Sequence, residues 1–225
     1  SLSAAYGLTH AGPTAMLDPS RSVDEHILAL LDDLEIRSVL AGNMADGLRQ
    51  IVDAVLSKRY PHHPRFDGPV NPSRMERARG LLERLLDIRD RRMNVERSER
   101  SDLKAYTDPL GLTDTGDVAT VLSDRPLQEL EQARQQRGLD VPTAGDVRSW
   151  LDPAGTRGLV PEVEDLLILT WCSWSGRTLQ RGGRPYVPPR LGQLPDDIEL
   201  LRPELPTPAH WDEARGEYTL GFPFP

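Results

Sequence analysis

The sequence is poor in cysteine, in lysine and in long apolar runs, and each shortage excludes a class of protein. Cys172 is the only cysteine among 225 residues, so no disulfide can form within the chain, and we expect a reducing, cytoplasmic compartment. Lys58 and Lys104 are the only lysines, and neither follows Gly and precedes Ser or Thr, as the lysine of a nucleotide phosphate loop does. The segment is therefore not expected to be an ATP-hydrolysing enzyme. No apolar run reaches the roughly 20 residues that a membrane helix needs.

The composition favours a modest folded core with long surface connections. Only 38% of the residues are hydrophobic, and the chain contains 20 prolines and 18 glycines. The formal net charge of -8 argues against a surface devoted to nucleic acid, because such surfaces neutralise phosphates with Lys and Arg. A local basic patch for DNA remains compatible with this charge.

Residues 159–176 form the longest apolar run, so we expect them to lie at the centre of the core. Pro161 suits the first turn of a helix, and the acidic residues that follow it favour the positive end of the helix dipole. Apolar side chains then recur on nearly every side, which is typical of a helix buried on several faces. Gly176 predicts where this helix ends.

We predict a mainly α fold in three segments. Residues 1–21 are an arm, residues 22–202 form a helical domain that can be divided at 122/123, and residues 203–225 are a proline-rich tail. The opening phrase SLSAAYGLTHAGP reads like the middle of a longer polypeptide, so we expect the chain to be a piece of one.

Apolar spacing and caps predict three helices in the first half. A capping box of Ser22 and Glu25 begins the first, a stripe from Leu40 to about Arg59 marks the second, and Asn71 caps the third. We expect the third helix to continue into the basic residues 89–97. The content of residues 71–122 suits a helix-turn-helix or winged-helix unit.

Shorter elements follow. Leu103 and Tyr106 indicate a short helix, and residues 118–122 are either a helix or a strand. A further helix ends at Gly138, and another short one begins near Thr143. Beyond the central helix, a tight turn over 181–185 predicts a β-hairpin with strands at 178–180 and 186–187.

The candidate contact residues form the only basic concentration in the chain, namely Arg89, Arg91, Arg92, Arg97 and Arg100. This cluster could bind phosphate or an acidic partner. Acidic neighbours at positions 90, 96 and 99 leave only a modest excess of positive charge. A solvated surface with ion pairs between neighbouring side chains is the alternative.

Three other features suggest chemistry but have simpler explanations. His62 and His63 are potential metal ligands, but adjacent side chains diverge, and a proline-bracketed connector explains them better. Cys172 lies inside the apolar helix, where thiols are usually inert. Ser175-Gly176-Arg177-Thr178 imitates the end of a phosphate loop, but Trp171 stands where its first Gly belongs. We therefore expect no catalytic, cofactor or metal residues here.

Several phrases together resemble a known family. Residues 41–66, which end in KRYPHHPRF, are similar to a passage of the large phage-resistance ATPases of the PglY and BrxC type. The phrases VPEVEDLLILTWCSWSGRTLQRGG and LGQLPDDIEL, at 160–183 and 191–200, resemble a later region of the same proteins.

The resemblance implies an intracellular parent protein of the phage growth limitation or BREX defence systems. ATP would be the cofactor of the parent, whose phosphate loop has no counterpart here. This segment would be a non-catalytic interaction or regulatory region that contacts other defence proteins or the rest of its own polypeptide. The alternative is a winged-helix DNA-binding module that uses the cluster from Arg89 to Arg100.

Overall fold

The computed structural model describes residues 43–203. The arm, the helix predicted to begin at Ser22 and nearly all of the proline-rich tail lie outside the described residues. The chain divides into two compact units, Ser1–Pro61 and His62–Pro225, which are described separately.

Within the first unit, the structure describes helix α2, Met44–Arg59. Asn43 caps it by accepting a hydrogen bond from the backbone N–H of Asp46 at 2.9 Å. The predicted helix is confirmed from Met44 to Arg59, while Leu40 lies outside the described residues. The apolar side chains of α2 are not all buried. Leu48 and Val52 are exposed, together with Leu56 one turn further on.

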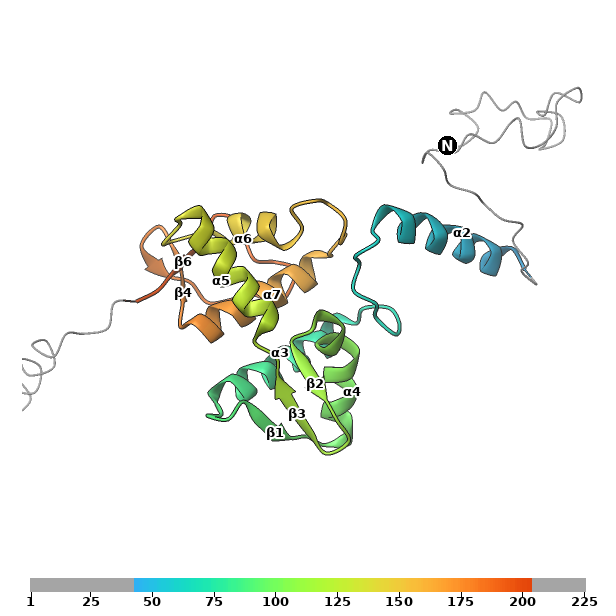
Figure 1. Ribbon diagram of the computed structural model, residues 1–225, viewed down its shortest axis with the longest axis horizontal. Coiled ribbons are helices and arrows are strands. Elements are labelled where there is room, and N and C mark those ends of the chain that lie inside the picture. The colour runs from blue at the N-terminus through green and yellow to red at the C-terminus, as the bar shows by residue number, and fades with distance from the viewer. Residues whose placement is uncertain (1–42, 204–225) are drawn as a thin grey trace, which may run out of the picture. The chain divides into compact units, whose positions relative to one another are not determined.

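The second unit begins with two helices and a small sheet. Its elements are α3 (Pro72–Asp87), β1 (Arg92–Asn94), α4 (Arg97–Tyr106), the 3-10 turn η3 (Asp108–Leu110), β2 (Thr113–Thr115) and β3 (Ala119–Leu122). The strands pair antiparallel in the order β1-β3-β2 (Figure 1). α3 packs against α4, β3 and the later helix α7 (Pro161–Ser175), so it links the sheet to the rest of the unit.

The prediction that the third helix continues through residues 89–97 is wrong. α3 ends at Asp87, because Ile88 adopts an extended conformation and Arg91 a left-handed one, with φ 53°. After this turn the burial of side chains alternates, with Met93 and Val95 inward and their neighbours outward. This period of two is that of a strand, and it places residues 92–94 in β1.

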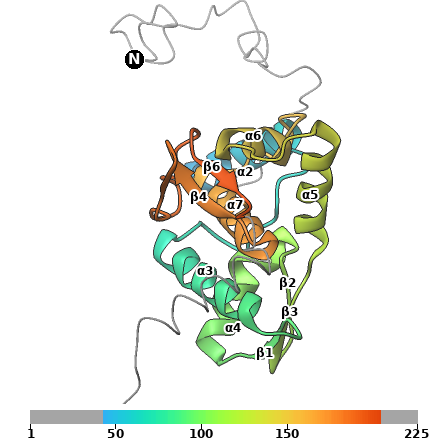
Figure 2. The ribbon, with the colours of Figure 1, turned by 90° about the vertical axis from the view of Figure 1, so that its left-hand side faces the viewer.

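The remaining elements surround α7. They are α5 (Arg125–Arg137), α6 (Ala144–Leu151), β4 (Thr178–Arg181), β5 (Arg184–Pro185) and β6 (Glu199–Leu201). α5 and α6 both pack against α7, as two views of the ribbon show (Figures 1 and 2). The predicted hairpin is present, but its second strand lies two residues earlier than expected because Gly182 and Gly183 alone make the turn.

The prediction that residues 159–176 lie at the centre of the core is confirmed. The nine buried residues of α7 include Leu166, Ile168 and Trp171, which are fully buried. Gly176 ends the helix in the left-handed conformation, with φ 68°, where its backbone N–H reaches the carbonyls of Cys172 and Ser173.

Candidate interaction surface

The five arginines of the predicted basic cluster lie on three neighbouring segments. Arg89 and Arg91 belong to the turn between α3 and β1, and Arg92 begins β1. Arg97 and Arg100 lie in α4. The cluster therefore follows a turn, an edge strand and the start of a helix rather than one helical face.

Two of these arginines are constrained by the fold. Arg91 shapes the turn, since its backbone N–H donates to the carbonyl of Ile88 at 3.1 Å and its own carbonyl accepts from Leu122 at 2.9 Å. Nη1 of Arg100 lies 3.9 Å from the carboxylate of Asp117. The side chains of Arg89, Arg92 and Arg97 are exposed, so these three are the ones that a partner can reach.

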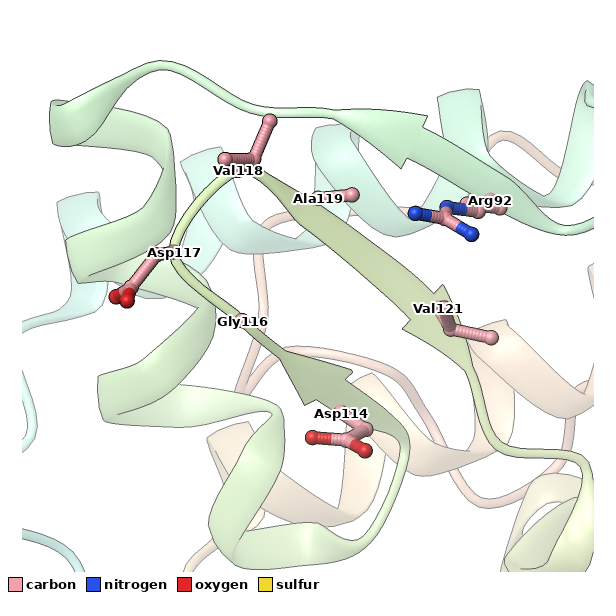
Figure 3. Close-up of a pocket in the computed structure, with 7 residues that line it drawn as sticks. All are labelled: Arg92, Asp114, Gly116, Asp117, Val118, Ala119 and Val121. Atoms are coloured by element: carbon pink, nitrogen blue, oxygen red, sulfur yellow. The ribbon is translucent and has the colours of Figure 1, made fainter.

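The outer face of the β1-β3-β2 sheet carries a row of three residues in register. Val121 of β3 stands opposite Arg92 of β1 on one side and opposite Asp114 of β2 on the other. These side chains line a shallow hollow of about 420 Å³, together with Gly116, Asp117, Val118 and Ala119. Figure 3 shows the lining residues as sticks. All three members of the row are exposed, including 41% of Val121.

The two charges of this row have no partner among the described residues. Neither the guanidinium of Arg92 nor the carboxylate of Asp114 forms a hydrogen bond or ion pair there. The middle strand separates them, and two strand spacings amount to about 10 Å. The face therefore presents a positive charge, an apolar side chain and a negative charge side by side.

Hydrogen bonds on the inner face of the sheet fix the β2–β3 hairpin, and with it the outer row of Arg92, Val121 and Asp114. Oδ1 of Asp108 accepts hydrogen bonds from the hydroxyls of Thr113 and Thr115 at 2.5 and 2.8 Å. Thr113 also contacts the hydroxyl of Thr107 at 2.5 Å, and Thr115 that of Thr120 at 3.0 Å. Hydrogen bonds to an ionised carboxylate are among the stronger ones, so the hairpin is fixed to the turn before it.

Asp114 and Val121 were not among the contact residues predicted from the sequence. The alternation in Thr113-Asp114-Thr115 was a usable signal, because it places the two threonines on one face and the aspartate on the other. The pattern of residues 118–122 is compatible with a helix or a strand, and the structure places Ala119–Leu122 in β3.

The segment that follows α4 is short and acidic. A helix-turn-helix places its second helix in the major groove of DNA. Here α4 is followed by η3, a single turn of three residues, Asp108-Pro109-Leu110, that contains no lysine or arginine. The hairpin beyond it carries Asp114 and Asp117.

His62 and His63 bind a loop of the protein. Nδ1 of His63 lies 2.7 Å from the carbonyl of Arg157, and Nδ1 of His62 lies 3.1 Å from the hydroxyl of Thr156. The backbone N–H of His62 also donates to the carbonyl of Thr156 at 3.2 Å. Within residues 43–203 no group of three or more His, Cys, Asp or Glu side chains is placed to hold a metal ion.

Cys172 near the end of the central helix and Arg177 just after it are structural in this fold. Burial raises the pKa of the Cys172 thiol to about 12, and its exposed fraction is only 1%. The guanidinium of Arg177 lies 4.8 Å from the ring centre of Trp171 and donates to the carbonyls of Asp140 and Leu200. Burial lowers the pKa of Arg177. Within the imitation of a phosphate loop, Arg177 is thus a buried packing residue.

A second polar centre joins α6, α7 and the loop before β6. Asp165, fully buried on α7, accepts from Nη2 of Arg148 at 2.5 Å and from the backbone N–H groups of Gly192 and Leu194 at 2.7 and 2.9 Å. Arg148 also bonds to Asp196. Burial lowers the pKa of Arg148, but the hydrogen bond and charge of Asp165 oppose this and raise it overall.

No helix in the described part of the chain is both long and apolar enough to cross a membrane. No solved structure matches the chain. Residues 73–172, which run from α3 to α7, match the family model described as "BREX System ATPase PglY protein 5th domain". The match covers the sheet, its outer face and most of the central helix, and it agrees with the resemblance drawn from the phrases. This match supports a PglY-type BREX protein region over residues 73–172.

Proposed function

We propose that this chain is a non-catalytic interaction region of a phage-defence ATPase, through which the ATPase is assembled with or coupled to partner proteins. The observation that carries the proposal is the match to the fifth domain of the PglY ATPase, together with a chain that has no phosphate loop. The nucleotide would bind in another part of the parent protein, in the cytoplasm. The partners would be other proteins of the defence system or the rest of the same polypeptide.

The geometry of the sheet supports a protein contact better than a DNA contact. The order α3–β1–α4–η3–β2–β3, with β3 in the middle of the sheet, is the connectivity of a winged-helix unit, and we propose that this region is built as one. The short turn η3 replaces the helix that would read bases. The acidic residues Asp114 and Asp117 lie beside the exposed Val118 and Val121. Surfaces that bind DNA gain most of their affinity from positive charge, whereas these elements are acidic.

The test is co-purification of the 225-residue chain with each protein encoded beside the ATPase gene. We expect at least one of them to be retained at physiological salt. The double variant Arg92→Glu/Asp114→Lys keeps the net charge and is the control in which only the charges on the outer face of the sheet are exchanged. If no protein of the operon and no other fragment of the ATPase binds the chain, the proposed role is incorrect.

DNA binding is the competing function, and the exposed arginines offer a sharp test of it. Arg92→Ala/Arg97→Ala removes two exposed charges without touching the turn formed by Arg91. A DNA-binding surface would lose affinity in this variant and would show a strong dependence on salt. Our proposal expects no shift of DNA at low salt with either protein, and binding that is lost in the variant would favour the DNA function instead.

A further inference from the structure

We infer that the outer face of the β1-β3-β2 sheet binds a second copy of the same chain. This inference goes beyond the proposed coupling role and rests on the sheet alone. Its basis is the row Arg92–Val121–Asp114, in which an exposed apolar side chain stands between two unpaired charges of opposite sign.

Such a row complements itself under one particular two-fold rotation. Symmetric dimers use the same surface patch on both subunits, so the patch must be its own complement. With the two-fold axis parallel to β3 and passing above Val121, the second sheet faces the first with its edges exchanged. Arg92 then faces Asp114 of the partner subunit, Asp114 faces Arg92 of the partner subunit, and the two Val121 side chains meet at the axis.

The other two-fold rotation that would bring these faces together is unfavourable. An axis perpendicular to β3 leaves the edges unexchanged, so Arg92 would face Arg92 of the partner subunit, and the two Asp114 carboxylates would also meet. Like charges placed opposite each other across an interface are repelled. The charges therefore select one orientation of the dimer, with both β2–β3 hairpins at the same end.

The next row of the sheet allows the two faces to approach. It consists of Asn94, Ala119 and Gly116, of which Gly116 donates its backbone N–H to the carbonyl of Ala119 at 2.9 Å. These side chains are short, so they leave room at the roughly 10 Å separation of packed sheets. The face is small beside a standard interface of about 1,600 Å², so we expect a weak dimer that forms at high concentration.

Cysteine cross-linking of the full chain tests this geometry. In the variant Val121→Cys, the two introduced thiols meet at the two-fold axis, and mild oxidation should yield a disulfide-linked dimer. Cys172 does not compete, because it is buried and its pKa is raised to about 12. Val187→Cys is the matched control, since Val187 is 83% exposed but lies far along the chain, outside this sheet.

Charge reversal then identifies the orientation. In the Val121→Cys background, Arg92→Asp or Asp114→Arg alone should weaken dimer formation about tenfold, because each converts both attractions into repulsions. The two reversals together should restore it. Cross-linking of Val121→Cys that does not exceed that of Val187→Cys would overturn the inference, and so would single reversals without effect or a double reversal that fails to rescue. Circular dichroism confirms that each variant is folded.

Discussion

The change Asp165→Ala should cost more stability than any other single truncation of a charged side chain in the described residues. Asp165 is fully buried and is the common acceptor of Arg148 and of two backbone N–H groups, those of Gly192 and Leu194. Truncation removes the buried partner of the partly buried Arg148 and leaves two amide donors without an acceptor. It therefore acts on α6, α7 and the following loop at once.

The size of the effect can be worked from these contacts. Breaking a buried ion pair by removing one partner costs about 3–5 kcal/mol, and each unsatisfied buried donor costs about 1–3 kcal/mol. These costs do not add fully, because Arg148 keeps its bond to Asp196 and water can reach the loop. We expect the free energy of unfolding to fall by about 4 kcal/mol, which lowers the midpoint of thermal unfolding by roughly 10–15 °C.

Urea unfolding followed by circular dichroism measures this change, with an unchanged m-value as the sign that the unfolded state is unaffected. Glu164→Gln is the control on the same helix, because Glu164 lies 3.3 Å from Arg148 but is partly solvated. Burial raises the pKa of Glu164, so its loss should change stability by less than about 1 kcal/mol. A loss below about 1 kcal/mol in Asp165→Ala would refute the argument.

Three further outcomes are expected. Leu167→Asp should prevent folding, because it places an unpaired carboxylate in the core, whereas Val187→Asp should leave the melting curve unchanged; a folded Leu167→Asp variant would mean that the centre of the core is misplaced. Cys172 should resist alkylation at pH 8 until urea unfolds the chain, and rapid modification of the native protein would contradict its burial. Partial burial raises the pKa of Asp152, but hydrogen bonds from three backbone N–H groups outweigh burial and lower the pKa overall. The stability that Asp152 contributes is therefore present above the pKa of the unfolded state and is lost as the pH falls through the lower pKa of the folded state. Asp152→Asn should flatten that acid dependence in urea titrations, and an unaltered slope would argue against it.

Most helices could be predicted from the sequence because their ends are marked by side chains that act locally. The side chains of Asn71 and Thr143 each accept a hydrogen bond from a backbone N–H in the first turn of a helix, and Gly176 ends a helix. The structure places a helix boundary at each of these residues. The division of the chain at Pro61 could not be predicted in the same way. It depends on how many contacts cross a connector, and such contacts leave no local pattern.

The sheet was harder to predict because its strands have only three or four residues. Residues 92–94 are basic and polar around a single buried methionine, and their strand character comes from pairing with β3, about 27 residues later. The end of α3 could not be predicted either, because Arg91 adopts the left-handed conformation in the turn that follows. An arginine gives no sequence signal for this conformation, whereas a glycine does. The row on the outer face exists only because three separate segments come into register.

The attachment of His62 and His63 to Thr156 and Arg157 also has a mechanical consequence. Tension applied to the chain before Pro61 would not pull directly on α3, because it first meets three hydrogen bonds to the loop between α6 and α7. Those bonds lie at the start of the second unit, so they would break before its core is loaded. The hydrogen bonds of His62 and His63 therefore protect the packing of α3 against α7 from force applied through the preceding part of the polypeptide.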